Sequence, residues 1–325
     1  MSVLAIIVSR LAKAALTLLA IAVLNFCLLH AAPGDPAVVL AGEAGAADEQ
    51  MIAQLRERFG LDQPFGVQLW KYVSGVAMLD LGYSFRQGAP VIDLIADRLP
   101  ATLLLTGVAF VISLVCGIAL GVAAAARVGK PQDSLLTTFA LLFYATPLYW
   151  AALMAVLVFS VWLGWLPGFG YETVGAGYTG WARVIDIAKH LVLPALTLGL
   201  FFMAVYMRMT RASMLEVSNA DFVKTGRAKG LSDKVIRRRH ILRNAILPVV
   251  TLAGLQAGQL IGGAVLTETV FAWPGIGRLM FESLAARDYN TILGVFLVSA
   301  AMVILFNIVT DIVYRLVDPR IGARA

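Results

Sequence analysis

Charged residues are scarce in this chain. Only 14% of its 325 residues are Asp, Glu, Lys or Arg, whereas 60% are hydrophobic and the mean hydropathy is +0.82. Soluble globular domains carry about 25% charged residues. A soluble fold of this length could not bury so much apolar surface, so the composition excludes an ordinary soluble protein and predicts a polytopic membrane protein.

Cysteine is also rare. The chain has two cysteines, Cys27 and Cys116, and both lie in apolar runs, which argues against a disulfide framework or a cysteine-based metal site. The net charge of +6 could suggest nucleic-acid binding. In a membrane protein, however, surplus Lys and Arg more often reflect positive charge kept on the cytoplasmic side. We therefore expect a phospholipid membrane, and no nucleic acid, as a partner.

Sequence motifs of catalysis are missing as well. The three histidines are widely separated, and neither HExxH nor GxSxG occurs. Gly129-Lys130 could end a phosphate-binding loop, but Ala124 stands in place of its first glycine and Pro131 in place of the magnesium-binding Ser or Thr. We expect no catalytic residue, no metal and no cofactor on this chain.

Long apolar runs are abundant, and a membrane-spanning helix needs about 20 apolar residues. The run after Arg10 and Lys13 ends in PGDP at 33–36 rather than in a small-residue cleavage site, which favours an uncleaved span over a signal peptide. Pro167 and Gly168 begin the loop after the third span. The sequence predicts an all-α fold with six membrane helices, at about 14–34, 99–126, 134–163, 191–207, 244–267 and 289–310.

Charge orients these spans. Lys and Arg gather in the N-terminal tail, in 127–133, in 208–243 and in the C-terminal tail, whereas acidic residues gather between Asp35 and Asp97. The positive-inside rule then places both termini in the cytoplasm. The expected parts are an N-terminal membrane helix (1–32), a small external helical insert (33–98), a five-helix core (99–317) with a cytoplasmic loop (208–243), and a cytoplasmic tail (318–325).

The insert shows helical periodicity. The sequence predicts helices over Asp48–Arg56, from Pro64 to Leu79, and over Val91–Leu99. Such helices would lie on the outer face of the membrane or cap the bundle.

Glycines recur at every fourth residue in two spans. Gly254, Gly258 and Gly262 lie in the fifth span, and Gly117 and Gly121 lie in the second. Small residues at this spacing let helix backbones approach closely. The pattern fits packing within one bundle, and it also fits a subunit seam or a face of a translocation pathway.

Few charges lie at membrane depth. Glu268 ends the fifth span, and Asp311 lies near the end of the sixth. Ionisable residues in spans are often functional, but both positions also suit a membrane interface. A proton- or sodium-driven carrier would bury more charge midway, so the sequence disfavours an ion-coupled carrier.

The cytoplasmic segment 208–243 has helix formers on both sides of Gly230, with Ser232 placed to cap the second helix. A basic loop that lies on anionic lipid is one interpretation. Such a loop would not need ordered helices, so the pattern favours a docking element for a soluble partner, with the arginines at its membrane-side end.

This segment resembles the cytoplasmic loop of ABC-importer permeases, most closely that of the dipeptide and oligopeptide subfamily. The family pattern is Glu-Ala-Ala, three residues and Gly; here Lys224, Thr225 and Gly226 take the first three places, and Gly230 matches the glycine. The matching stretches are DFVKTGRAKGL at 221–231 and RNAILP at 243–248, with further agreement in PGDP at 33–36, GLDQP at 60–64, DLGYS at 80–84, LPALTLG at 193–199 and FAWPGIGR at 271–278.

The resemblance implies a type I importer permease in a bacterial inner membrane. A second homologous permease subunit, usually a different one, would complete the translocation pathway. Two ATPase subunits would bind ATP and Mg and dock on the cytoplasmic loops, and an external solute-binding protein would deliver the substrate. ATPase closure would switch the spans from inward-facing to outward-facing as rigid bodies.

The resemblance also implies which residues act. Trp273, Pro274 and Arg278 would belong to the external docking surface, and the arginines from Arg237 to Arg243 would meet lipid phosphate or acidic groups of a partner. The coupling loop would comprise Lys224, Thr225, Gly226, Ala228, Lys229, Gly230, Leu231, Ser232, Arg239 and Arg243. The expected substrate is a di- or oligopeptide; the alternatives are nickel chelates, glutathione or another small solute, because the binding protein largely sets specificity in such importers.

Overall fold

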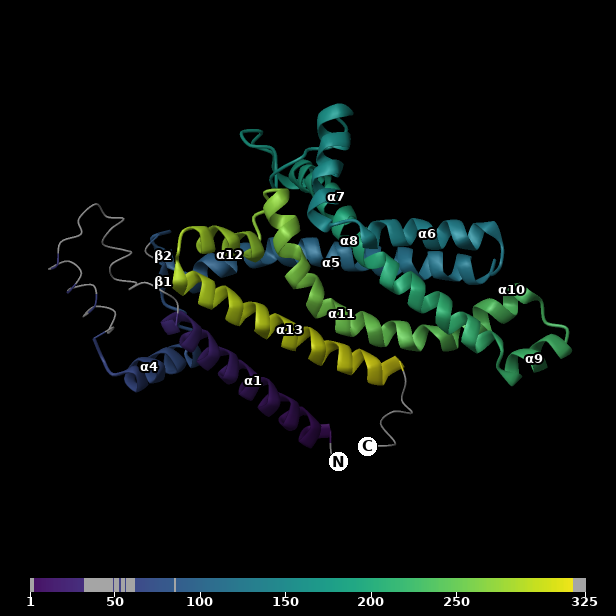
Figure 1. Ribbon diagram of the computed structural model, residues 1–325, viewed down its shortest axis with the longest axis horizontal. Coiled ribbons are helices and arrows are strands. Elements are labelled where there is room, and N and C mark those ends of the chain that lie inside the picture. Colours follow the sequence, from purple (N-terminus) through teal and green to yellow (C-terminus); the bar gives the residue numbers. More distant parts are fainter. Residues whose placement is uncertain are drawn as a thin grey trace. The chain divides into compact units, whose positions relative to one another are not determined.

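The computed structural model describes residues 3–31, 62–84 and 86–317, together with Glu49, Ala53 and Arg56. This part of the chain is mostly helical (Figure 1). The elements are α1 (Val3–Ala31), α4 (Phe65–Ala77), β1 (Tyr83–Ser84), β2 (Ala89–Pro90), α5 (Val91–Ala125), α6 (Pro131–Ala145), α7 (Leu148–Ala155), the π-helix η1 (Val156–Trp162), α8 (Gly180–Ser218), α9 (Asp221–Ala228), α10 (Asp233–Val235), the π-helix η2 (Ile236–Ile241), α11 (Leu242–Val270), α12 (Ile276–Ala285) and α13 (Tyr289–Val317).

Within the described residues, four helical stretches are long and apolar enough to cross a membrane: Val91–Ala125, Gly180–Ser218, Asp233–Gly258 and Tyr289–Thr310. The bent pair α6 and α7–η1 makes a fifth if it is one span, and Ala12–Leu28 is a shorter apolar helix. The predicted all-α polytopic membrane protein is therefore confirmed. The number of six spans and the side of each terminus stay predictions.

The chain forms two compact units. One comprises Met1–Asp97 and Leu279–Met302, and the other comprises Arg98–Arg278 and Val303–Ala325. In the first unit, the β1–β2 hairpin is held against the turn before α13. The Ser84 hydroxyl donates to the Asp288 carboxylate, and the Asn290 amide donates to the Tyr83 carbonyl at 3.0 Å. In the same unit, Phe26 of α1 packs against Tyr72 of α4, with 5.6 Å between the ring centroids.

The predicted helices of the external insert had mixed outcomes. The helix predicted from Pro64 to Leu79 is present as α4, whereas Asp48–Arg56 lies almost wholly outside the described residues. The separate helix predicted over Val91–Leu99 is wrong, because α5 runs without a break through Pro100 into the second predicted span. A single proline removes one backbone donor, and a long apolar helix can tolerate that loss.

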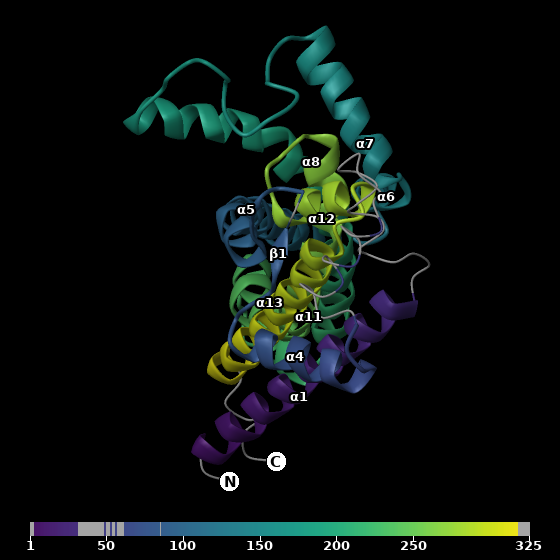
Figure 2. The same ribbon diagram turned by 90° about the vertical axis from the view of Figure 1, so that its left-hand side faces the viewer.

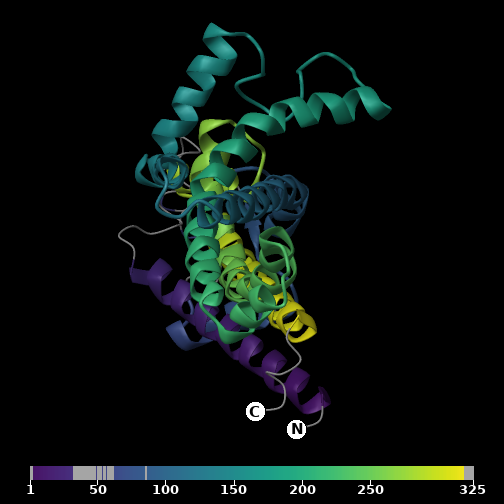
Figure 3. The same ribbon diagram turned by 90° about the vertical axis from the view of Figure 1, so that its right-hand side faces the viewer.

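The third predicted span, 134–163, is not one straight helix. α6 and the α7–η1 helix meet at an angle of 100° at Thr146 and Pro147. Thr146 has an extended backbone (φ −78°, ψ 130°) because the ring of a following proline disfavours the helical region. Figures 2 and 3 show the α7–η1 helix and the first turns of α8 diverging, with the loop between them.

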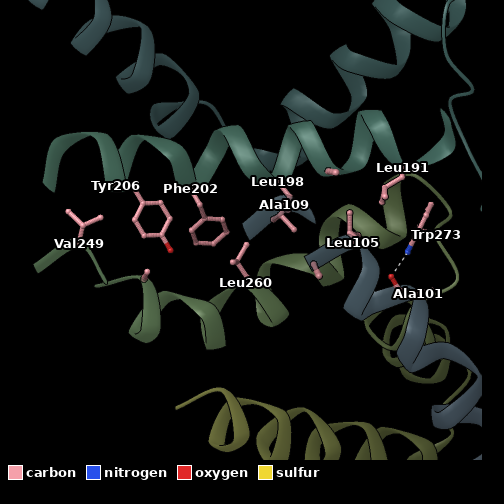
Figure 4. Close-up of a cluster of buried hydrophobic side chains, with 13 residues drawn as sticks. Ala101, Leu105, Ala109, Leu191, Leu198, Phe202, Tyr206, Val249, Leu260 and Trp273 are labelled. Carbon is pink, nitrogen blue, oxygen red and sulfur yellow. Dashed lines mark hydrogen bonds between the residues drawn. The ribbon is translucent and has the colours of Figure 1, made fainter. Parts of the chain in front are cut away.

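The core of the second unit lies along α8 (Figure 4). Leu198, Phe202 and Tyr206 of α8 are buried against Leu105 of α5 and Leu260 of α11, among other residues of one cluster. α8 extends past the predicted span 191–207 at both ends, and its buried residues also continue beyond that span, from Asp186 to Met214. Packing of this kind stabilises a helix more than propensity does.

Close helix contacts account for several of the spaced glycines. A Cβ at Gly121 of α5 would lie 2.7 Å from the Met207 carbonyl oxygen and 2.6 Å from Thr210 Cβ, both on α8. A Cβ at Gly254 would overlap the Thr310 side chain of α13.

The remaining two glycines of the fifth-span pattern differ from each other. A Cβ at Gly258 would lie 3.0 Å from Val303 Cγ1, whereas no described atom lies within 4 Å of one at Gly262. Packing within the chain therefore explains Gly254 and Gly258, and Gly262 keeps both interpretations.

A charged pair fastens α6 to α8. The guanidinium of Arg211 donates to both carboxylate oxygens of Asp133, at 2.8 and 2.7 Å. The Asp133 side chain is only 8% exposed. Bidentate pairs of this kind fix orientation as well as distance, so the start of α6 is held at a set position on α8.

Candidate coupling site

The connection from α8 to α11 is ordered along its whole length (Figure 1). After α8 ends at Ser218, the amide of Val223 bonds to the Ala220 carbonyl at 3.0 Å and starts α9. α10, η2 and α11 then follow one another directly, because Ile236 and Ile241, where they meet, keep helical backbone angles. The short helix α9 thus lies between two long helices.

Gly230 makes the turn after α9. Its φ is +76°, in the left-handed region that favours glycine. Its amide bonds to the Arg227 carbonyl at 2.9 Å, and the Leu231 amide bonds to the Gly226 carbonyl at 3.2 Å. These two bonds form a Schellman motif, which satisfies the last carbonyls of the helix. The predicted helix–glycine–helix pattern is therefore present.

The inner side of α9 is buried. Val223 and Gly226 face inward, and Val223 belongs to a cluster that includes Met214 of α8, Ile236 and Ile241 of η2, and Ala245 of α11, with Leu242 and Val217 packed around it. Three helical pieces, α8, η2 and α11, thus hold α9 in place.

Gly226→Ala is expected to stabilise the segment. Gly226 has a helical backbone, and an added Cβ would lie 3.7 Å from the nearest atom, Leu231 Cδ1, which is an ordinary contact. Alanine in place of a helix-interior glycine contributes about 0.5–1 kcal/mol. Thermal unfolding of the purified protein should show a small increase in melting temperature, and a decrease would contradict the described packing.

The outer side of α9 combines charge with exposed apolar surface. Phe222 is 47% exposed and Leu231 is 39% exposed. Lys224 donates to Asp221 at 2.8 Å, one turn earlier on the same surface. Aromatic side chains and arginines are enriched at protein interfaces, and α9 presents Phe222 together with the exposed Arg227.

The arginines follow on the next helix. Arg237, Arg238 and Arg239 of η2 are exposed, as is Arg243 at the start of α11. Ser232 occupies the N-cap position of α10 as predicted, but within the described residues its side chain makes no capping hydrogen bond. The predicted side-chain cap is wrong: the Ser232 carbonyl accepts from the Ile236 amide at 3.0 Å, so the backbone closes this one-turn helix.

A second ordered turn joins α11 to α12. Trp273 is fully buried, and its Nε1 donates to the Ala101 carbonyl at 2.8 Å. The Arg278 guanidinium donates to the Ala272 carbonyl at 2.6 Å. Trp273 was predicted to dock an external partner, and its burial argues against a direct contact. Its ring instead packs the turn, while Pro274 and Arg278 are partly exposed.

Comparison with known proteins identifies the family. A family model described as "Binding-protein-dependent transport system inner membrane component" matches residues 117–323. The chain belongs to this family. A model for the N-terminal part of such membrane components matches residues 3–106. The chain is thus the permease component of a binding-protein-dependent ABC importer.

Curated relatives align with the permease over nearly their full length. The dipeptide transport system permease protein of Alkalihalophilus pseudofirmus is 39% identical, over 94% of this chain and 95% of its own. The corresponding dipeptide permease of Escherichia coli K12 is also 39% identical, over 97% and 98%. A putative peptide transport system permease of Brucella abortus is again 39% identical, over 98% of both chains.

Solved structures share the fold. An inward-facing structure of the MetNI methionine ABC transporter matches with a TM-score of 0.56 and 18% identity, over 69% of the permease and 96% of that chain. A crystal structure of an amino acid ABC transporter with histidines matches with a TM-score of 0.50 and 15% identity, over 69% and 94%.

The structure collects the predicted coupling residues of the permease in one place. Those from Lys224 to Ser232 lie on α9 and its turn, Arg239 lies on η2, and Arg243 lies at the start of α11. Phe222 was not among the predicted coupling residues. An aromatic residue beside Val223 on a basic helix could have indicated an exposed position on the same surface. Among the described residues, no three His, Cys, Asp or Glu side chains gather to hold a metal ion.

Proposed function

We propose that the permease imports di- or oligopeptides and receives the motion of two ATPase subunits through α9 and its turn. The names of the 39%-identical relatives support the substrate class. The exposed face of α9, held between α8 and α11, is the observation that carries the coupling role. A short helix packed against long helices can transmit a displacement that a flexible loop would absorb.

The proposed assembly has a second homologous permease subunit, most simply a different one, and an external solute-binding protein. ATP and Mg would be bound by the ATPase subunits and not by this chain. In a bacterial inner membrane, six spans with both termini on the cytoplasmic side would place α9 on the same side as the ATPase subunits. Pro274 and Arg278 remain candidates for the external docking surface. Nickel chelates, glutathione or another small solute would use the same architecture with a different binding protein.

Purification of the whole complex tests the partners and the substrate. Mass spectrometry should find ATPase subunits with the permease, and the binding protein should release or bind a peptide. In proteoliposomes, uptake of that peptide should need ATP and stop with vanadate. Uptake that instead collapses with an ion gradient, with no ATPase present, would contradict the proposal.

Phe222→Ala is expected to weaken ATPase docking about tenfold, because exposed aromatic anchors contribute more than 1 kcal/mol to many interfaces. The fraction of ATPase that co-purifies with the permease at graded salt measures this. Trp181→Ala is the matched control, since Trp181 is 81% exposed at the opposite end of α8. Equal retention in the two variants would exclude Phe222 as an anchor.

A further inference from the structure

The buried carboxylate of Glu268 has no role in the proposed coupling segment. Glu268 lies near the end of α11 and is 0% exposed. Its Oε1 accepts from the Thr102 hydroxyl at 2.6 Å, and its Oε2 accepts from the amides of Gly277 at 2.8 Å and Arg278 at 3.0 Å. A buried charge is costly unless it is hydrogen-bonded in this way.

These bonds join three helices. Thr102 belongs to α5, and its hydroxyl oxygen also accepts from the Ile276 amide at the start of α12, at 2.8 Å. Glu268 itself belongs to α11. One carboxylate and one hydroxyl therefore connect the end of α11 to α5 and to the first turn of α12. A Cβ at Gly275 would collide with the Glu268 carboxyl, so the turn closes tightly around it.

The turn also holds the loop that precedes α8. The Gly170 amide donates to the Phe271 carbonyl at 2.9 Å, and the rings of Tyr171 and Trp273 lie 4.8 Å apart. Movement of the α11 end would therefore be passed to α5, to α12 and to this loop together.

The other end of α11 is the coupling segment. η2 continues directly into α11, whose 29 residues extend about 43 Å at 1.5 Å per residue. α11 thus connects the arginine-rich segment beside α9 with the buried carboxylate.

We propose that Glu268 is a positioning residue of the transport cycle: its carboxylate joins the end of α11 to α5 and α12, so that displacement entering at α9 reaches the opposite end of the permease. This inference rests on the proposed coupling role of α9. It assigns a function to Glu268, whose position in the sequence fitted a membrane interface equally well.

Three variants test the junction in the whole complex. Glu268→Gln keeps the length of the side chain but cannot accept the Thr102 proton through its amide nitrogen while its oxygen serves the two amides. Thr102→Val keeps the shape and removes the hydroxyl, and Thr102→Ser keeps the hydroxyl as the matched control. Thr102→Val maintains the test if the glutamine variant does not assemble.

Single cysteines report movement at each end, in a background without Cys27 and Cys116. Val174→Cys lies on the loop attached to the turn, where Val174 is 98% exposed, and Glu216→Cys lies on the exposed surface of α8 close to α9. Maleimide reactivity is measured with and without ATP and vanadate, alongside ATP hydrolysis stimulated by the binding protein.

In the unaltered complex and in Thr102→Ser, both probes should respond to ATP and vanadate. In Glu268→Gln and Thr102→Val, the Glu216 probe should still respond, the Val174 probe should not, and stimulated ATP hydrolysis should fall about tenfold, within the usual range for coupling between sites. A normal Val174 response in both variants would overturn the proposal, as would loss of both responses in assembled Thr102→Val. A silent Glu216 probe in the unaltered complex would instead contradict the coupling role of α9.

Discussion

Gly230→Pro is expected to abolish uptake while the permease still inserts into the membrane. Proline holds φ near −65°, whereas Gly230 has φ +76°. The proline would also remove the amide that bonds to the Arg227 carbonyl. A backbone angle that proline cannot adopt and the loss of a hydrogen-bonded amide both destabilise the folded turn, so the turn would open and α9 would leave its place on η2. Peptide uptake in proteoliposomes measures the effect, and vanadate-sensitive ATP hydrolysis shows whether the two activities have separated.

Gly230→Asn is the matched control, because asparagine tolerates the left-handed region better than other non-glycine residues. It should keep most of the uptake. No described atom lies within 4 Å of a Cβ at Gly230, so the asparagine side chain has room. Normal uptake in the proline variant would show that α9 does not transmit the motion.

Gly121→Val is expected to disrupt the packing of α5 on α8. The added Cβ would meet the Met207 carbonyl oxygen at 2.7 Å, and backbone atoms of a long helix cannot move aside cheaply. Overpacking of this kind costs about 3 kcal/mol when the backbone must shift. We expect a markedly lower melting temperature of the purified complex and a smaller yield from the membrane.

Gly107→Val is the matched control. Gly107 lies on α5, as Gly121 does, but it does not face α8 at close range. No described atom lies within 4 Å of a Cβ at Gly107, and Gly107 borders an apolar cavity of about 360 Å³ between α5, α11 and α13. The Gly107 variant should melt near the unaltered protein. If both variants melted alike, the α5–α8 contact at Gly121 would not be as close as described.

Sequence patterns predicted most reliably where one local rule decides. Gly230 ended α9 as predicted, because the left-handed turn favours glycine whatever the surroundings. Pro147 obeys a similar local rule, because the residue before a proline favours an extended backbone, as Thr146 has. The apolar run continues on both sides of Pro147, however, so the sequence was interpreted as one straight span. Composition reports whether a segment is apolar, and it does not report whether the helix through it is straight.

Tertiary contacts decided the outcomes that no local pattern could show. Trp273 was expected on the external docking surface, but its indole N–H donates a hydrogen bond to the Ala101 carbonyl in the interior. Glu268 was equally compatible with a membrane interface in the sequence. Its burial could not be predicted because its hydrogen-bond donors are Thr102, 166 residues earlier in the chain, and the following turn. Long-range partners of this kind are not visible in a single sequence.

The size of α9 has a consequence for how the importer is assembled. A helix of eight residues is too short to persist alone in water, and α9 owes its shape to Met214, Ile236 and Ala245 on three neighbouring helical pieces. A synthetic peptide copied from 219–231 should therefore be unstructured and a poor competitor for the ATPase. In the proposed assembly, the docking surface would form only once α8 and α11 have packed together, so the ATPase would recognise permease that has already folded in the membrane and would not bind chains that have not.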